Sequence, residues 1–254
     1  MGLIYKTKQC ILYQGDCIEI MQKLIDKGRK VDAVITDPPY GKTHNKWDSV
    51  IPLPDMWDKI HGLIKPNGAI ILFGQDKFSA KLMLSNEKEH RYNLIWKKGE
   101  RTSGFLNAKR MPLRNHEDIM VFYQKLPVYN PQFTEGQPLH GKGNAYLTKE
   151  CTNNNYGKFD QLDDVRKGST QKYPKSILTF DRPHPPIHPT QKPVDLLEYL
   201  IKTYTNEGDI VLDFTMGSGS TGVACMKTNR KFIGIELEEK YFIMSRERIE
   251  KANE

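Results

Sequence analysis

The chain has 254 residues, of which 38% are hydrophobic and 27% charged, and its formal net charge at pH 7 is +7. This length allows one good-sized core, or one core with a modest insertion, and the balance is typical of an ordinary soluble domain. No apolar run approaches the roughly 18 residues that a membrane span requires, so we expect no membrane association. None of the four cysteines is at CxxC spacing, which argues against a metal site and suits reduced thiols in a cytoplasm.

Strand-like and helix-like segments alternate through the first half of the chain. Runs rich in β-branched and other apolar residues predict strands over 10–13, 31–36, 69–73, 92–96 and 118–123. Amphipathic segments predict helices over 17–26, 53–64 and 76–84. We expect Asp76 to cap the third of these helices and 65–68 to form a turn.

This periodicity is lost from Pro127 to about Ile187, where Pro, Gly, Asn and Lys are frequent. Long irregular segments of this kind are usually functional or disordered. Order returns with a helix that Pro193 opens, a strand over 209–213, a helix from about Ser220, a strand over 231–236 and a charged final helix. The alternation predicts an α/β fold with a mostly parallel, doubly wound sheet and an irregular insertion.

The catalytic candidate is the tetrapeptide Asp37-Pro38-Pro39-Tyr40, which ends a buried strand. In a doubly wound sheet the carboxyl end of a strand faces the ligand crevice. Asp37 and the fixed backbone at Pro38 offer two acceptors to an amino group, and Tyr40 offers a stacking face for a base. Such acceptors would favour pyramidalisation of the amine and point its lone pair outward, so no covalent enzyme intermediate is needed.

A glycine-rich turn follows the strand that ends at Asp213, and it has G-x-G-x-x-G spacing from Gly217 to Gly222. The spacing alone is also compatible with a phosphate site or a plain turn. Glu236 ends the next strand about 20 residues later, where a carboxylate can accept both ribose hydroxyls. Together the two features predict a nucleoside-bearing cofactor.

Basic residues cluster between 97 and 115, where there is one acidic residue, Glu100. Such a stripe is typical of a surface that binds a phosphate backbone, although a solvated protein face has the same composition. The predicted DNA-binding residues are Lys97, Lys98, Arg101, Lys109, Arg110 and Arg114.

Over nearly its whole length the chain resembles the amino-methylating DNA methyltransferases of the β arrangement, in which the catalytic motif precedes the cofactor loop. The matching segments are 12–17, 37–40, 116–122, 188–193, 213–222 and Glu236. The resemblance implies a Rossmann-like methyltransferase fold, S-adenosylmethionine as cofactor, and double-stranded DNA as substrate. It also implies a division into a catalytic half (1–124), a target-recognition insertion (125–187) and a cofactor-binding half (188–254).

The resemblance assigns catalysis to Asp37, Pro38, Pro39 and Tyr40. The family usually has Asp-Pro-Phe before the glycines, whereas this chain has Asp213-Phe214-Thr215, so we assign Phe214 only a backbone contact. The residues expected to bind the cofactor are Asp16, Cys17, Asp37, Thr190, Lys192, Asp213, Phe214, Gly217, Ser218, Gly219, Ser220 and Glu236.

The family's Asp-Pro-Pro-Tyr motif goes mostly with adenine, so the expected reaction is N6-methylation of a flipped adenine by direct displacement. Cytosine-N4 methylation is the alternative within the family, and a partner endonuclease would fit a restriction–modification role. Methyltransferases for RNA bases or protein glutamine typically place the cofactor loop before the catalytic motif, the reverse of the order here. A catalytically dead DNA-binding module is a third alternative, against which an intact Asp37 and cofactor loop argue.

Overall fold

A computed structural model of the chain describes residues 4–41, 50–138, 152–153, 157–158, 168–187 and 191–253. The chain divides into two compact units, Met1–Asn130 with Lys175–Glu254, and Pro131–Pro174. In the smaller unit, β7 (Thr134–Glu135) pairs with β10 (Gln171–Lys172), and β8 (Thr152–Asn153) pairs with β9 (Gly157–Lys158). This smaller unit falls inside the segment predicted to be an irregular insertion.

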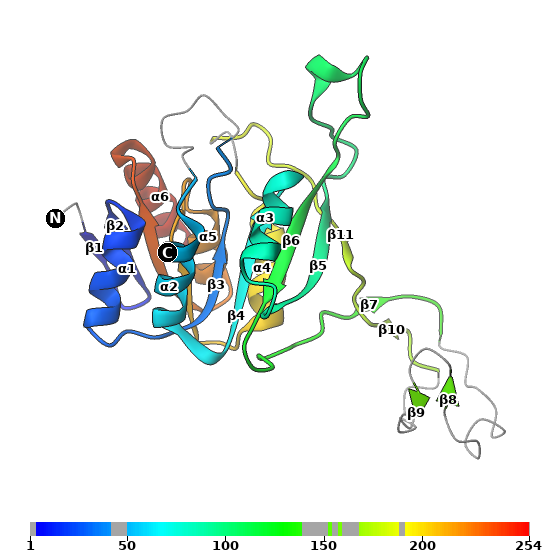
Figure 1. The fold of residues 1–254 in the computed structure, drawn as a ribbon, viewed down its shortest axis with the longest axis horizontal. Helices are drawn as coiled ribbons and strands as arrows, with labels where there is room; N and C mark the ends of the chain where they lie inside the picture. Colours follow the sequence, from blue (N-terminus) through cyan, green and yellow to red (C-terminus); the bar gives the residue numbers. More distant parts are fainter. Residues whose placement is uncertain are drawn as a thin grey trace. The chain divides into compact units, whose positions relative to one another are not determined.

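The larger unit is built on one nine-stranded sheet of order β1-β2-β13-β12-β3-β4-β6-β5-β11 (Figure 1). Neighbouring strands run parallel except where β1 meets β2 and where β6 lies between β4 and β5. The strands are β1 (Ile4–Lys6), β2 (Cys10–Gln14), β3 (Val31–Thr36), β4 (Ile64–Gly74), β5 (His90–Lys97), β6 (His116–Phe122), β11 (Ile177–Thr179), β12 (Ile210–Asp213) and β13 (Lys231–Glu236). The prediction of a mostly parallel α/β sheet is confirmed.

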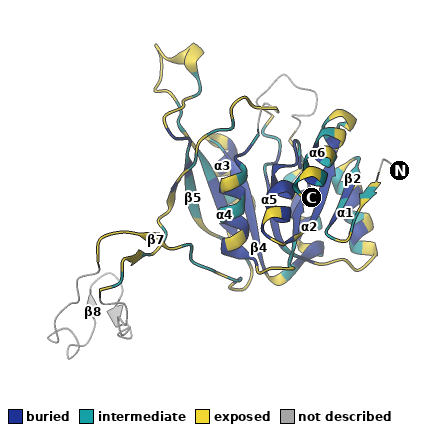
Figure 2. Cartoon of the chain, turned by 180° about the vertical axis from the view of Figure 1, so that it is seen from behind, coloured by how far each residue is buried: buried dark blue, intermediate teal, exposed yellow. Residues whose placement is uncertain are grey.

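Within the described ranges, six α-helices cover the two faces of this sheet, and each face has its own apolar cluster. The helices are α1 (Cys17–Asp26), α2 (Leu53–Leu63), α3 (Lys77–Ser85), α4 (Val194–Tyr204), α5 (Ser220–Lys227) and α6 (Glu239–Ala252). The first three pack on one face and the last three on the other. Alternate strand residues point to opposite faces, so the strands contribute apolar side chains to both clusters. Figure 2 shows the buried sheet between helices whose outer surfaces are exposed.

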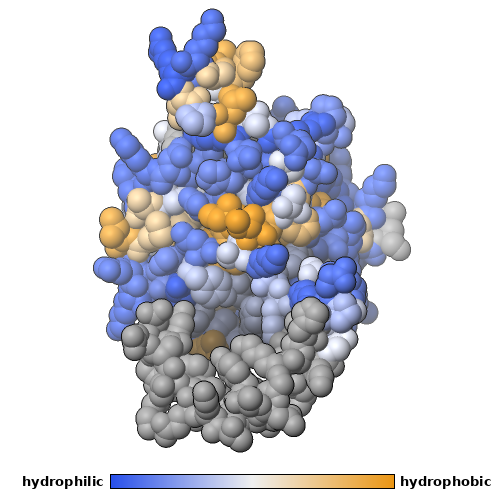
Figure 3. All heavy atoms as spheres, turned by 90° about the vertical axis from the view of Figure 1, so that its right-hand side faces the viewer, coloured by the Kyte–Doolittle hydropathy of each residue, from blue (hydrophilic) through white to orange (hydrophobic). Residues whose placement is uncertain are grey.

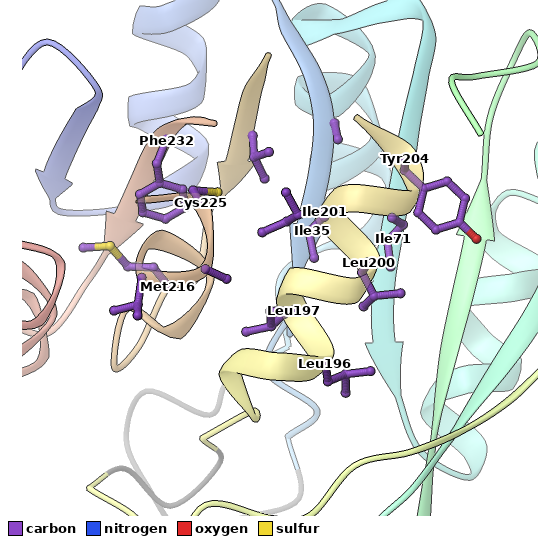
Figure 4. Packing of buried hydrophobic residues seen from close by; sticks show 14 of the residues in the cluster. Ile35, Ile71, Leu196, Leu197, Leu200, Ile201, Tyr204, Met216, Cys225 and Phe232 are labelled. Carbon is purple, nitrogen blue, oxygen red and sulfur yellow. The ribbon is translucent and has the colours of Figure 1, made fainter. Parts of the chain in front are cut away.

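The helix α4 illustrates how the apolar pattern directs packing. Leu197, Ile201 and Tyr204 recur at helical spacing and are buried. Figure 4 shows Ile201 beside Ile35 of β3 and the neighbouring turn of α4 over β4. The site described below depends on this face, because α4 follows directly after the segment that contains Lys192.

Three local predictions are wrong. Residues 65–68 are part of the extended strand β4, where the pairing with β3 shifts register between Val31 and Ala33. Asp76 occupies the N-cap position of α3 at φ +54° without a side-chain cap, and its carboxylate instead accepts a hydrogen bond from Arg114 at 2.9 Å. Residues 177–179, predicted to be irregular, form β11 at the edge of the main sheet.

Among the helices that the structure describes, none is both long and apolar enough to cross a membrane.

Candidate active site

The parallel strands β2, β3, β12 and β13 bring their carboxyl ends to one edge of the sheet, and a pocket lies there. Asp16, Asp37, Asp213 and Glu236 each end one of these strands or follow it closely, and all four line the pocket. The sequence placed these residues at strand ends, and the crossover connections between parallel strands collect them into one site.

The catalytic candidate, Asp37, lies immediately after β3. Its Oδ1 accepts a hydrogen bond from the Tyr40 hydroxyl, and its backbone carbonyl accepts one from Thr215 Oγ1 at 3.1 Å. The Tyr40 ring packs against Phe78 of α3, with centroids 4.8 Å apart. The motif is therefore anchored from the side of α3 and from the loop after β12, and it presents Asp37 to the pocket.

Lys192 is the second partner of Asp37, and its Nζ forms an ion pair with Asp37 Oδ2. The same Nζ lies 3.3 Å from Glu117 Oε2, and Lys98 Nζ donates to Glu117 Oε1 at 2.5 Å. Four charges of alternating sign thus lie in sequence, from Asp37 through Lys192 and Glu117 to Lys98. Two residues predicted to have other partners, Lys192 and Lys98, belong to this chain of ion pairs.

Burial changes the acid–base properties of these groups. Burial raises the pKa of Asp37, and the Lys192 ammonium opposes that rise. Burial alone would lower the pKa of Lys192, but the carboxylates of Asp37 and Glu117 hold it above its ordinary value. Burial would likewise raise the pKa of Glu117, and the two lysines hold it below its ordinary value. The Lys192 ammonium therefore favours the charged forms of Asp37 and Glu117, and the two carboxylates favour the charged form of Lys192.

Glu236, predicted to bind ribose, ends β13 with its carboxylate at the glycine-rich turn. Its Oε2 accepts the Gly217 N–H at 2.8 Å, and its Oε1 accepts the Glu238 N–H at 2.9 Å. Gly217 and Gly219 have φ values of +50° and +73°, which favour glycine. Burial raises the pKa of Glu236, and the backbone N–H donors oppose that rise. The turn, the carboxylate and the start of α5 at Ser220 form one wall of the pocket.

Asp213 lines the same pocket, but hydrogen bonds from the protein engage both of its carboxylate oxygens. Its Oδ1 accepts from Thr36 Oγ1 at 2.7 Å and from the Thr215 N–H at 3.1 Å, and its Oδ2 accepts from Thr221 Oγ1 at 2.6 Å. Burial raises the pKa of Asp213 to about 6. These contacts tie the loop after β12 to β3 and α5, so the structure favours a scaffold role over a direct cofactor contact.

The remaining predicted cofactor residues lie around the pocket. Asp16 is the N-cap of α1 and accepts the Glu19 N–H at 3.0 Å, and Cys17 follows it. Burial raises the pKa of the Cys17 thiol to about 12, which makes it a neutral wall residue. The Phe214 side chain is buried in the apolar cluster under α1, α2 and α3. Ser218 and Ser220 line the pocket, whereas Thr190 lies outside the described residues.

Glu117, Thr215 and Arg248 are among the residues at the site that the sequence reasoning missed. Glu117 belongs to a segment that the resemblance marks only as framework, and Thr215 stands where the family's pattern differs. Arg248 donates from Nη1 to the Ser218 carbonyl and, at 3.3 Å, to Ser220 Oγ. Arg248 is one of several charged residues in α6, so nothing in the sequence indicated that it supports the glycine-rich turn.

The basic stripe lies on a projection formed by residues 98–115 between β5 and β6. Figure 3 shows this projection at the top, where hydrophilic and hydrophobic side chains lie together. Phe105 and Leu106 near its tip are 81% and 96% exposed. The arginines and lysines at positions 101, 109 and 110 are exposed, and Lys97 is half-buried.

The structure contradicts the prediction that Lys98 contacts DNA phosphates. It is 5% exposed and paired with Glu117, so its ammonium is directed into the protein. Arg114 is partly engaged as well, because its Nη1 donates to Asp76 Oδ2 at 2.9 Å. The accessible part of the stripe is therefore smaller than its composition indicates. No cluster of three or more potential metal ligands occurs among the described residues.

Known proteins resemble the chain over most of its length. A family model described as DNA methylase, of the N6/N4 type, matches residues 31–247. The Type II methyltransferase M2.DpnII of Streptococcus pneumoniae is 29% identical over 98% of this chain and 93% of its own length. The Type II methyltransferase M2.LlaDCHI of Lactococcus lactis subsp. cremoris is 28% identical over 98% and 92% of the two chains.

Solved structures agree with these sequence matches. The structure of an M1.HpyAVI–SAM complex has a TM-score of 0.63 at 28% identity, covering 93% of this chain and 98% of that one. The PvuII DNA methyltransferase, described as cytosine-N4-specific, also has a TM-score of 0.63, covering 98% of this chain and 91% of that one. It is only 15% identical, so this second match supports the fold alone.

Proposed function

The chain belongs to the N6/N4 DNA methylase family and is an S-adenosylmethionine-dependent DNA methyltransferase, and we propose that its target is the exocyclic amino group of adenine in double-stranded DNA. The observation that carries the assignment to an exocyclic amine is that Asp37-Pro38-Pro39-Tyr40 lines the same pocket as Glu236 and the glycine-rich turn, and the choice of adenine rests on the Asp-Pro-Pro-Tyr motif itself. The acceptor for an amine and the wall for a nucleoside-bearing cofactor therefore share one cavity.

The residues present fit the cofactor. Each Glu236 oxygen accepts one backbone N–H and has a further lone pair that can accept a ribose hydroxyl. The residues that we propose hold the cofactor directly are Asp16, Cys17, Gly217, Ser218, Ser220 and Glu236, whereas the Cα of Gly219 faces Ser245 and Ile249 of α6. When bound, S-adenosylmethionine supplies an electrophilic methyl group.

The protein's contribution to the reaction is to orient the amine. A base flipped from the duplex would stack near Tyr40, and one amine hydrogen would donate to Asp37. A carboxylate oxygen has more than one acceptor site, so Asp37 can accept this hydrogen while it keeps its bonds to Tyr40 and Lys192. Positioning and electrostatics then carry catalysis, without a nucleophilic residue of the enzyme.

We assign DNA contact to the projection 98–115 and sequence recognition to the segment 125–187. The exposed basic residues at 101, 109 and 110 support the first assignment, because such side chains pair with phosphates at any sequence. The small two-stranded pairs β7–β10 and β8–β9 lie in the second segment. The relatives named above are Type II methyltransferases, so we propose that this chain also serves a restriction–modification system in the cytoplasm, with a separate endonuclease.

The test is to treat unmodified double-stranded DNA with the enzyme and S-adenosylmethionine, digest it to nucleosides and identify the product by mass spectrometry. N6-methyladenine is expected. N4-methylcytosine would overturn the base assignment alone, whereas methyl groups found only on RNA or protein would overturn the proposed substrate. Asp37→Ala should abolish transfer while cofactor and DNA still bind. Turnover above about a tenth of wild type, a loss below about 1.4 kcal/mol, would contradict the role of Asp37.

A further inference from the structure

Four charged side chains, 6–18% exposed, connect the catalytic carboxylate to the root of the DNA-facing projection. We propose that Lys192 is a positioning residue that fixes and orients the Asp37 carboxylate, and that Glu117 and Lys98 hold Lys192 in place. This inference rests on the proposed function, because it presumes that Asp37 accepts the target amine. It replaces the expectation that Lys192 binds the cofactor.

The geometry of Lys192 leaves its ammonium little freedom. Its side chain is 8% exposed, and Nζ contacts Asp37 Oδ2 on one side and Glu117 Oε2, 3.3 Å away, on the other. The same Nζ lies 5.1 Å from the centroid of the Phe73 ring, within the range of a cation–π interaction. A buried lysine between two carboxylates is fixed in position, and it aligns whichever carboxylate oxygen it contacts.

Glu117 is held in the same way from the other side. Lys98 Nζ, 2.5 Å from Glu117 Oε1, lies 5.3 Å from the centroid of the Trp96 ring. Glu117 is opposite Trp96 in the antiparallel pairing of β5 and β6, so the sheet itself fixes its backbone. Glu117 is on β6 and Lys98 directly follows β5, and the projection 98–115 rises from these two strands. The chain of charges therefore begins at the root of that projection and ends at Asp37.

The electrostatic consequence for Asp37 has a definite sign. Burial raises the pKa of Asp37, Glu117 raises it further, and the Lys192 ammonium opposes both. Removing Lys192 would therefore raise the pKa of Asp37 and make the carboxylate lose its charge at a higher pH. Among the described residues, the charged or titratable groups that face these four are Tyr40 after β3, Asp118 on β6, Arg182 before α4 and Asp213 on β12.

The experiment compares Lys192→Met with Lys192→Arg under single-turnover conditions, where product release does not mask the methyl-transfer step. At pH 7 we expect Lys192→Met to slow transfer by about 30-fold or more at saturating cofactor. The acid limb of its pH–rate profile should move by about one unit or more to higher pH, so that part of the rate returns near pH 9. Lys192→Arg keeps the charge and should retain the wild-type profile.

Two results would overturn the role of Lys192. One is a Lys192→Met rate that falls equally at every pH, because a merely structural lysine would leave the profile unmoved. The other is weakened S-adenosylmethionine affinity in calorimetry with an unchanged rate at saturating cofactor, which would return Lys192 to the cofactor site. A wild-type enzyme inactive on all DNA would instead refute the proposed function, so the two failures are distinguishable.

Glu117→Gln tests whether Glu117 and Lys98 hold Lys192 in place. Glu89→Gln is the matched control. Glu89 is a buried carboxylate whose Oε2 lies within hydrogen-bond distance of His61 Nε2, at 2.9 Å, but it lies away from the pocket. We expect Glu117→Gln to slow transfer by about tenfold or more with unchanged cofactor affinity, and Glu89→Gln to leave the rate unchanged. A Glu117→Gln rate within about threefold of wild type would overturn the role of Glu117 and Lys98.

Discussion

Replacing Asp213 by asparagine separates a scaffold role from a cofactor contact. The Asp213 carboxylate accepts hydrogen bonds from Thr36, Thr221 and the Thr215 backbone. An asparagine can keep all three contacts, because its Oδ1 still accepts two of them and its amide nitrogen can donate to Thr221, whose hydroxyl also accepts. The substitution therefore removes the negative charge and leaves the geometry of the loop intact.

The magnitude follows from the pKa of Asp213. Burial raises it to about 6, whereas an aspartate in an unfolded chain has a pKa near 3.9. Between these values the folded state binds more protons than the unfolded state, so wild-type stability falls as pH rises through this interval. Two pKa units correspond to about 3 kcal/mol. The asparagine variant lacks this loss, so it should match wild type near pH 4 and exceed it by about 3 kcal/mol at pH 7.

Urea unfolding of the two proteins between pH 4 and pH 8 measures this difference directly. Asp213→Ala is the control, since it leaves Thr221 and the Thr215 N–H without their acceptor. It should be less stable than Asp213→Asn by about 1–3 kcal/mol per donor at every pH. If the free energy of unfolding had the same pH dependence in wild type and Asp213→Asn, the raised pKa of Asp213 would be refuted. S-adenosylmethionine affinity reduced by more than about tenfold in Asp213→Asn would instead show that Asp213 contacts the cofactor.

Three further predictions follow from the site. Glu236→Ala should weaken S-adenosylmethionine binding by about 10- to 100-fold in calorimetry, because charge-assisted acceptors are lost; unchanged affinity would remove Glu236 from the cofactor site. Lys109 and Arg110 changed together to Ala should weaken DNA binding at all sequences and reduce the salt slope by about two; an unchanged slope would identify a solvated face. A Cβ added at Gly222 would lie 2.4 Å from Ile249 Cδ1, so Gly222→Ala should cost about 1–3 kcal/mol in chemical denaturation, and full stability would show that α6 can yield.

The accessible DNA-facing surface shows how composition and structure differ. Six basic residues in one short segment have the same formal charge in the sequence, but the structure gives them different partners. Lys98 is directed inward to Glu117, and Arg114 contacts Asp76, whereas the residues at 101, 109 and 110 remain exposed. The phosphate-binding charge of the projection 98–115 is therefore assigned to its outer part.

Local patterns in the sequence determined much of the fold. The β-branched runs predicted the central strands, and Leu197, Ile201 and Tyr204 are buried on the helix that was predicted to follow Pro193. Because parallel strands share an edge, residues at strand ends were expected to meet, and Asp37, Asp213 and Glu236 do line one pocket. The order of the catalytic motif and the glycine-rich turn indicated the family, to which the chain belongs.

Only the tertiary structure decided the partners of the charged groups. Lys192 pairs with Asp37 across 155 positions of sequence, and Asp213 accepts from Thr36 across 177. Periodicity reports which face a side chain occupies, but it carries no information on which opposite charge reaches that face from a distant segment. Burial of Lys98 and the ionic chain through Glu117 arise from the packing of β5, β6 and the segment before α4. Residue type and motif thus identified the site, whereas the long-range packing that excludes water from these charges set what each one does.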